Sequence, residues 1–409
     1  MAPHNGLVHP KQYDIKDSNV ELIGPDLDHR VKHNSALTEP AWNNGRVGQE
    51  PGLFIWRIEN FEVVPWPKDR TGEFYDDDSY IVLCSAKLGD DNNNLRHDIF
   101  FWLGNKTTQD EGGTAAYKTV ELDEFLHGAA TQHREVQDHP SEDFAALFRR
   151  ITIRSGGVAS GFTHVEEEKP KEVTTLLRVF KHPGDGATPG RSRSVIVYEV
   201  EPTWQSLDDD DVFVLDKGEK IWVWQGKNCS PMEKAMAAQV VNDMTLAKHI
   251  DVEVLSRHES RSKVVVDLLG GKDVDVLRTT FKAPRPIALP KRARESVSAG
   301  TGVETHPRKL FRLSDASGEL AFDLVKDGGP VRRSDFDGDD VFLYDVGNRL
   351  WVWQGLGASQ REKTLWLKVA QAYVRRLQSQ ESESDASTMP ISKVVQNHES
   401  PSFLKMVNF

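Results

Sequence analysis

The chain has 409 residues, of which 38% are hydrophobic and 28% charged, and its formal net charge at pH 7 is −12. A chain of this length is too long for a single hydrophobic core of ordinary size, which predicts two or three domains. The acidic balance argues against broad attraction to nucleic acid. No apolar run reaches the roughly 18 residues that a membrane helix needs.

The first residues and the cysteines add two expectations. The opening Met-Ala-Pro-His-Asn-Gly lacks the basic and apolar pattern of a secretory signal, so we expect a cytoplasmic protein. Cys84 and Cys229 are too few for a disulfide framework or a four-cysteine metal site, and we expect free thiols.

In chain order, a polar extension over 1–50 is followed by the first of three similar units, over 51–162. This unit carries DDSYIVLCSAK from Asp77 and then LRHDIFFWLG, which read as two strands separated by a long polar turn. A helix is predicted to begin near Glu111.

The second unit, over 163–270, and the third, over 306–409, are clear copies of each other. Residues 210–234 read DDVFVLDKGEKIWVWQGKNCSPMEK and residues 339–363 read DDVFLYDVGNRLWVWQGLGASQREK, mostly identical without a gap. Glycine-containing turns at 216–220 and 345–349 predict hairpins, and helices are predicted to begin near Glu233 and Glu362.

Between these copies, 271–305 holds three prolines among basic residues and is predicted to be an extended, mobile linker. A strand meander followed by a long helix must bury the apolar side of that helix on a sheet. We therefore expect an α+β fold of three tandem units, each a mixed sheet packed against a long and a shorter helix.

An aspartate before the first hairpin strand and a glutamate at the helix start recur in all three units, as Asp78/Glu111, Asp211/Glu233 and Asp340/Glu362. If the chain folds back as described, these carboxylates converge and suit a hard cation such as calcium. The alternative is solvated acidic turns and glutamates that favour a helix start through the helix dipole.

The first predicted helix has two apolar sides. Ala115, Leu122 and Leu126 cluster on one, whereas Tyr117 and Val120 lie roughly opposite beside charged residues. One side packs on its own sheet and the other suits a partner's hydrophobic cleft, unless both are buried within the chain.

Basic residues gather around the junction of the first two units. They favour a phosphate-binding surface or a solvated basic strand edge. This basic set comprises Arg149, Arg150, Arg154, Lys169, Lys171, Arg178, Lys181, Arg191 and Arg193. Nearby, His133, Glu135 and His139 favour structural polar contacts over a zinc site. No nucleophile-elbow, Walker or dinucleotide motif appears, so we predict no enzymatic activity.

These units, together with GLFIWRIENF, LDEFLHGAATQHREVQ and GGVASGF, resemble the gelsolin/villin superfamily over about residues 52–409. The extension is similar to that of the three-repeat, severin- and fragmin-like members. The resemblance implies a calcium-regulated protein of the actin cytoskeleton, expected to be a monomer, that severs actin filaments and caps their barbed ends. Relatives also bind phosphoinositides through the region of the basic set.

Carried over by position, the resemblance implies the following residues. Calcium ligands fall on the carbonyls of Asp77 and Val158 with Asp78 and Glu111; on Asp210, Asp211 and Glu233; on Asp339, Asp340 and Glu362; and, in a site shared with actin, on Asp123 with the carbonyls of Gly128 and Ala130. Actin contacts fall on Ala116, Tyr117, Val120, Glu121 and Glu124. Many members have Gly-Asp where this chain has Asp-Asp, so the extra carboxylate changes the site.

Two rival functions stay open at this level. One is calcium-dependent barbed-end capping without severing, and the other is a calcium-binding scaffold without actin activity.

Overall fold

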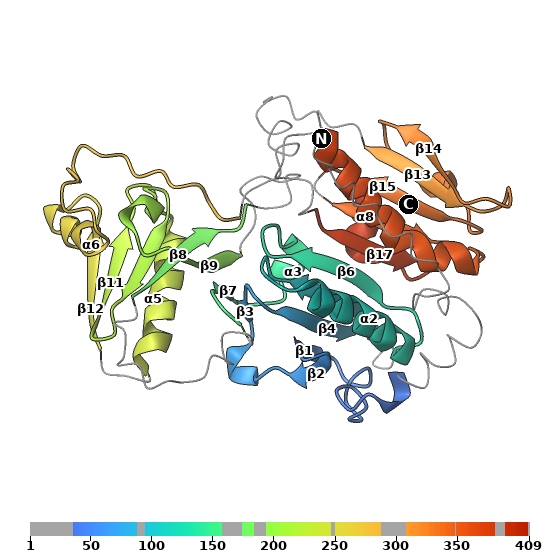
Figure 1. The fold of residues 1–409 in the computed structure, drawn as a ribbon, viewed down its shortest axis with the longest axis horizontal. Helices are drawn as coiled ribbons and strands as arrows, with labels where there is room; N and C mark the ends of the chain where they lie inside the picture. The colour runs from blue at the N-terminus through green and yellow to red at the C-terminus, as the bar shows by residue number, and fades with distance from the viewer. Residues whose placement is uncertain are drawn as a thin grey trace, which may run out of the picture.

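The computed structural model describes residues 36–87, 95–157, 174–183, 194–246, 250–287, 308–347, 349–380 and 389–407 (Figure 1). Within these residues, no helix combines the length and the apolar composition needed to cross a membrane.

Each repeat is built on five strands in the same spatial order, with the second strand at one edge and the fifth at the other. The strands of the first repeat are β1 (Gly52–Glu59), β2 (Glu62–Pro65), β4 (Ser79–Lys87), β5 (Leu95–Leu103) and β6 (Thr131–Val136). Those of the second are β8 (Thr175–Lys181), β9 (Val195–Val200), β10 (Val212–Asp216), β11 (Lys220–Gln225) and β12 (Asp251–Ser256). Those of the third are β13 (Lys309–Ser314), β14 (Ala321–Asp327), β15 (Val341–Asp345), β16 (Leu350–Gln354) and β17 (Ile391–Val395).

The repeats join through their sheets. The fifth strands β17 and β6 pair antiparallel, so repeats 1 and 3 share one ten-stranded sheet. Repeat 2 forms a seven-stranded sheet that takes in two short strands of repeat 1, β7 (Ile151–Arg154) and β3 (Glu73–Tyr75). Both sheets are mixed, because the fifth strand of each repeat runs parallel to the fourth.

In each repeat, a long helix covers one face of the strands of that repeat. These helices are α2 (Gln109–Phe125), α5 (Pro231–Leu246) and α8 (Gln360–Gln380). Shorter helices follow the fifth strands, namely α3 (Glu142–Ala145), α6 (Lys263–Leu268) and α9 (Pro401–Met406). The predicted α+β class is confirmed, and α2 and α8 lie on the same face of the ten-stranded sheet (Figure 1).

Both predicted hairpins form at the predicted turns, between β10 and β11 and between β15 and β16. The start of the expected linker behaves differently. Val276 and Phe281 pack in the core of repeat 2, and Ile287 is fully buried in a cluster formed by residues of repeats 1 and 2. Their apolar side chains hold 271–287 against the protein, so the prediction of an extended, mobile segment is wrong for these residues.

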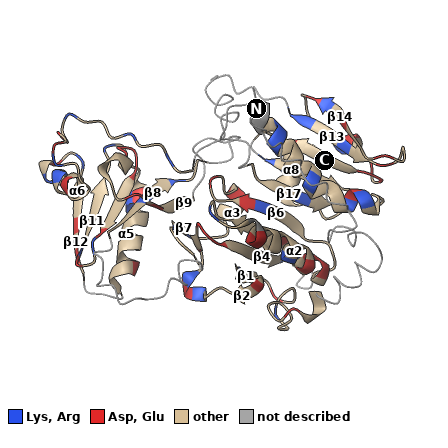
Figure 2. Ribbon diagram, in the orientation of Figure 1, with Lys and Arg blue, Asp and Glu red and all other residues tan. Residues whose placement is uncertain are grey.

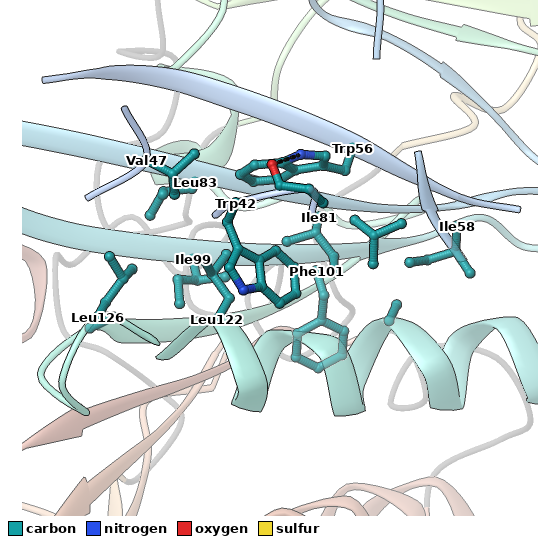
Figure 3. Close-up of a cluster of buried hydrophobic side chains, with 14 residues drawn as sticks. Trp42, Val47, Trp56, Ile58, Ile81, Leu83, Ile99, Phe101, Leu122 and Leu126 are labelled. Carbon is teal, nitrogen blue, oxygen red and sulfur yellow. Dashed lines mark hydrogen bonds between the residues drawn. The ribbon is translucent and has the colours of Figure 1, made fainter. Parts of the chain in front are cut away.

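The described end of the polar extension is also part of a core. Trp42 is fully buried among Leu83, Ile99 and Leu122, between the sheet and α2 (Figure 3). Its indole N–H donates to the carbonyl of Ala36 at 2.9 Å, which satisfies the polar atom that burial would otherwise leave without a partner. Repeat 1 is therefore completed by residues that precede its first strand.

We predict that Trp42→Ala lowers the free energy of unfolding of the protein by about 3 to 5 kcal/mol, because it removes a large buried ring and leaves a cavity. Urea unfolding followed by fluorescence and circular dichroism measures the change. Leu37→Ala is the matched control, since that side chain is 44% exposed in the same segment and its loss should cost under about 0.5 kcal/mol. Equal effects of the two changes would contradict the packing role of Trp42.

Candidate functional site

The acidic turn of each repeat is held by the same pair of backbone hydrogen bonds. In repeat 1 the Gly104 N–H donates to the carbonyl of Asp78 at 3.0 Å, and the Lys106 N–H donates to that of Asp76 at 2.9 Å. The equivalent bonds join Gly226 and Asn228 to repeat 2's turn, and Gly355 and Gly357 to repeat 3's turn. A Cβ on Gly104, Gly226 or Gly355 would approach a turn carbonyl within 3.0 Å, so only glycine fits there.

In repeats 2 and 3 the glutamate at the helix start is partly a capping group, as the simpler alternative predicted. Glu233 accepts hydrogen bonds from the amides of Ser230 at 2.7 Å and Lys181 at 2.9 Å. Glu362 accepts them from the amides of Ser359 at 3.0 Å and Asp315 at 2.7 Å. In repeats 2 and 3 the glutamate thus ties the helix start to the end of the first strand.

Repeat 3 also brings its carboxylates together. Burial raises the pKa of Glu362, and the nearby charges of Asp315 and Asp340 raise it further, whereas the amide hydrogen bonds oppose this rise. Arg312 approaches Asp340 at 3.9 Å. Converging carboxylates with a distant cationic partner favour the uptake of a metal cation.

In repeat 1, Asp78 is buried beside Arg57, whose Nη1 lies 3.3 Å from its Oδ2, and the Tyr80 hydroxyl donates to the same oxygen at 3.1 Å. Gly157 packs directly on this carboxylate, since a Cβ there would collide with Oδ1 of Asp78. Glu111 accepts a hydrogen bond from the Thr107 hydroxyl at 3.3 Å. Val158, expected to provide a carbonyl ligand, lies outside the described residues.

Repeat 2 has the same turn but different partners. Arg178 donates from Nε to Oδ2 of Asp211 at 2.7 Å, and Arg285 donates from Nη2 to Oδ1 at 2.7 Å. Arg178 was expected in the surface-exposed basic set, yet only 1% of its side chain is exposed. The anionic turn holds it inside the protein, so we remove it from the candidates for a phosphate-binding surface.

Asp123, on α2, is the centre of a separate arrangement. Its Oδ1 accepts from the Ala130 amide at 3.0 Å, and Gly128 adopts a φ of 73° that lets the loop fold over the carboxylate. From repeat 3, the Lys393 ammonium lies 3.9 Å from Oδ2. Burial raises the pKa of Asp123 and lowers that of Lys393.

Across the described part of the chain, His, Cys, Asp and Glu side chains form no group of three or more with metal-ligand geometry. A cation at these turns would therefore need backbone carbonyls besides the carboxylates, as the sequence analysis expected for Asp77, Gly128 and Ala130. Calcium accepts such mixed oxygen ligands.

The predicted two-sided helix is present. Ala115, Leu122 and Leu126 are buried on the sheet, whereas 44% of Tyr117 and 40% of Val120 are exposed. Glu121, expected as a surface contact, is only 1% exposed and pairs with Lys118 at 2.8 Å. Lys118 also pairs with Glu39 at 2.7 Å, so the N-terminal segment covers Glu121. Ala116 and Glu124 are partly buried.

Most described members of the basic set already have acidic partners. Arg150 pairs with Asp243 at 2.6 Å and Arg154 with Glu199 at 2.8 Å. Arg149 is exposed and Lys181 is partly exposed. Lys169, Lys171, Arg191 and Arg193 lie outside the described residues.

Polar contacts at the joint between repeats 1 and 3 were not predicted from the sequence. His133 contacts Ser392 at 2.9 Å and Asp98 at 3.3 Å, which agrees with the structural role favoured for this histidine. Arg349 donates to Asp143 at 2.6 Å, and Ser402 donates to the same carboxylate at 2.7 Å. Figure 2 shows acidic residues along α2 and basic residues along α8, which lie on one face of the shared sheet.

Comparisons with known proteins agree with the repeat structure. A family model described as the gelsolin repeat matches residues 60–145, 193–264 and 327–404. Gelsolin-like protein 1 of Lumbricus terrestris is 37% identical over 376 residues, which cover 91% of this chain and 92% of that protein. Severin of Echinococcus granulosus is 34% identical over 406 residues, or 98% of each chain. Gelsolin of Gallus gallus is 37% identical over 81% of this chain and 40% of its own length.

We predict that Arg349→Gln weakens the joint of repeats 1 and 3 by about 1 to 3 kcal/mol, between the values for exposed and buried ion pairs. Burial raises the pKa of Asp143, but Arg349 and other partners lower it to about 2. The stability from this depressed pKa is present above the usual aspartate range and is lost as the pH falls towards 2.

Thermal unfolding between pH 5 and pH 2 measures this effect. Arg349→Gln should show a shallower loss of Tm on acidification than the parent chain, since this guanidinium then no longer lowers the pKa of Asp143. Arg261→Gln, at a side chain that is 74% exposed in repeat 2, is the control. An unchanged pH dependence in Arg349→Gln would contradict the contribution of this ion pair.

Proposed function

This chain belongs to the gelsolin family, and from that premise we propose that it severs actin filaments and caps their barbed ends under the control of calcium. The observation that carries the proposal is the exposed apolar side of α2, opposite a side that is fully engaged with the sheet. Severin, as a relative over the whole length of the chain, supports severing as well as capping.

The exposed side of α2 has the chemistry of a docking helix. Tyr117 and Val120 lie about one helical turn apart, so their exposed side chains form one short apolar ridge rather than two separate apolar spots. Glu124 continues the same side with a charge at the rim. A helix with this pattern inserts its apolar ridge into a hydrophobic groove and places its charges at the edge. We assign the groove to the barbed face of an actin subunit.

Calcium is proposed at repeats 1 and 3 and at Asp123. In repeat 3, Asp340 and Glu362 bring buried carboxylates together, and the carbonyl and side chain of Asp339 are next in the chain. In repeat 1, Asp78 and Glu111 are the side-chain candidates, with the Asp77 and Val158 carbonyls. At Asp123, the loop carrying Gly128 and Ala130 provides carbonyls. In repeat 2 the Asp211 carboxylate is held by Arg178 and Arg285, so we leave the Asp210, Asp211 and Glu233 set out of the proposal and confine it to the other turns.

Calcium would act as a switch on the joint between repeats 1 and 3. In this structure the two repeats are packed together through β6 and β17, and α8 lies on the same sheet face as α2. Lys393 of repeat 3 approaches Asp123 of repeat 1, so a cation at Asp123 competes with a contact that holds the packed state. A ligand shifts such an equilibrium only when it prefers one state.

The remaining expectations stay proposals. Of the described basic set, Arg149, which is exposed, and Arg150, Arg154 and Lys181, which are partly exposed, are the residues that we propose for contact with the filament side or a phosphoinositide headgroup. We also propose a monomeric, non-catalytic protein of the cytoplasmic actin cytoskeleton. The protein's effect on filaments would come from binding energy alone.

Fluorescence microscopy of actin filaments tests the function directly, with the purified chain in a calcium chelator and then in micromolar calcium. We expect filaments to break only with calcium and their barbed ends then to stop growing. Growth arrest without breaks would favour calcium-dependent capping alone. Calcium binding without any effect on filaments would favour the scaffold, and would contradict the actin proposal.

We predict that Tyr117→Asp combined with Val120→Asp reduces capping affinity roughly thirtyfold or more, because charges replace the central apolar anchors of the interface. Pyrene-actin elongation from filament seeds measures the affinity. Val264→Asp is the matched control, since this side chain on α6 of repeat 2 is 43% exposed. Full capping by the double variant, folded with an unchanged Tm, would exclude α2 as the contact.

A further inference from the structure

An arginine occupies one fixed ladder position in the first strand of every repeat. Arg57 pairs with Tyr80, Arg178 with Phe213 and Arg312 with Phe342. In each case the partner lies two residues after the turn aspartate, namely Asp78, Asp211 or Asp340. Side chains two positions apart on a strand share a face, so this register points each guanidinium towards its own turn.

The three arginines engage their turns to different degrees. The shortest distance from the guanidinium to the aspartate of its own turn is 2.6 Å for Arg178, 3.3 Å for Arg57 and 3.9 Å for Arg312. The exposed fraction of the arginine side chain rises in the same order, from 1% to 19% to 45%. Arg57 additionally pairs with Glu59, which divides its charge between two carboxylates.

In repeat 2, the guanidinium of Arg178 has several hydrogen-bond acceptors around it. Besides Asp211, the guanidinium donates to the Pro284 carbonyl at 2.8 Å and to the Ala283 carbonyl at 3.3 Å, and it lies 3.3 Å from Asp208. Arg285, from the same segment, takes the second oxygen of Asp211. The turn therefore fastens the chain that leaves repeat 2, which continues to the buried Ile287.

A third arginine completes this arrangement. Arg257 is buried and lies 3.2 Å from Asp209, and it also donates to the Val276 and Thr279 carbonyls. Repeat 3 has Gly338 at the position of Asp209, where a Cβ would contact Gln396, the residue that takes the place of Arg257. The two most similar repeats thus differ in the cations around their turns.

These contacts make repeat 2 a poor calcium site. Calcium would have to take Asp211 from two guanidinium groups that cannot lose their charge by deprotonation. Arg178 would then remain buried without its main anion, which is strongly unfavourable. The helix-start glutamate does not distinguish the two repeats, because both oxygens of Glu233 and both oxygens of Glu362 accept amide hydrogen bonds.

We propose that the first-strand arginine is an internal counter-cation that sets the calcium affinity of each acidic turn. In repeat 2, Arg178 and Arg285 replace calcium, and the turn serves to hold residues 283–287. Repeat 3, with the most distant arginine, binds calcium most tightly. The inference rests on the proposed calcium function for repeats 1 and 3, but its claim about repeat 2 concerns contacts within this chain.

Isothermal titration calorimetry of the full-length chain, freed of metal by a chelator and titrated with calcium chloride, tests the proposal. Asp211→Asn should leave the number of bound calcium ions unchanged, whereas Asp340→Asn should reduce it by one. Loss of one calcium ion in Asp211→Asn, with circular dichroism showing a folded protein, would overturn the proposal.

The converse experiment restores a metal site. Arg178→Gln combined with Arg285→Gln leaves Asp208 and Asp211 without their cations, so this variant should bind one calcium ion more than the parent chain. Its Tm in the chelator should fall, and calcium should raise it by more than it raises the Tm of the parent chain. A folded double variant with no additional calcium ion would refute the counter-cation role.

A milder variant covers the case in which the double variant does not fold. Arg285 is 35% exposed, and Arg285→Gln alone should gain calcium-dependent thermal stabilisation. Arg278→Gln makes the same charge change at a side chain that is 90% exposed, and should gain none. Equal responses of these two variants would contradict the proposal.

A failure of the proposed calcium function at the other repeats can be distinguished from a failure of the counter-cation role. If neither the parent chain nor Asp340→Asn binds calcium while the arginine variants gain a calcium ion, the calcium switch is wrong and the counter-cation role stands.

Discussion

The close approach between the acidic turn and the glycine that ends the second hairpin strand is the constraint on which each repeat depends. Gly104, Gly226 and Gly355 let the two backbones meet, and the two resulting hydrogen bonds fix the turn beside the helix start. The aspartate of this turn is buried in all three repeats. A side chain at the glycine would separate the turn from the strand and disrupt both the site and the fold of the repeat.

On this common backbone frame, the surrounding cations decide what a turn can do. Burying a carboxylate costs free energy unless a cation or hydrogen-bond donors compensate for its charge. Repeat 2 meets that cost with arginines from its own chain, and repeat 3 leaves Asp340 with a distant partner. Because an internal arginine is present whatever the calcium level, the same motif becomes a permanent structural fastening in one repeat and a candidate sensor in another.

Local patterns predicted the hairpins, the helix starts and the apolar sides of α2, because each depends on neighbours in sequence. The misses involve partners distant in sequence. Trp42 completes a core from outside the recognised repeat, and Arg178 looks like any surface cation until the register of β8 against β10 places it on Asp211. Glu121 reads as exposed on a helical wheel, but Lys118 and the N-terminal segment cover it. Nothing in the periodicity of β6 indicates that β17 pairs with it.

That pairing is the shortest strand pairing in the shared sheet, since only Ile391, Ser392 and Lys393 are in register with β6. Backbone hydrogen bonds contribute about 0.5 to 1.5 kcal/mol each, so the strand contact contributes a few kcal/mol in all. Converting a two-state equilibrium from one side almost wholly to the other requires about 5.5 kcal/mol of differential binding. A joint of this size, reinforced by Lys393 on Asp123 and Arg349 on Asp143, lies within the reach of a few bound cations. The position of Lys393 is decisive, because a cation at Asp123 would act on the joint itself rather than at a distance.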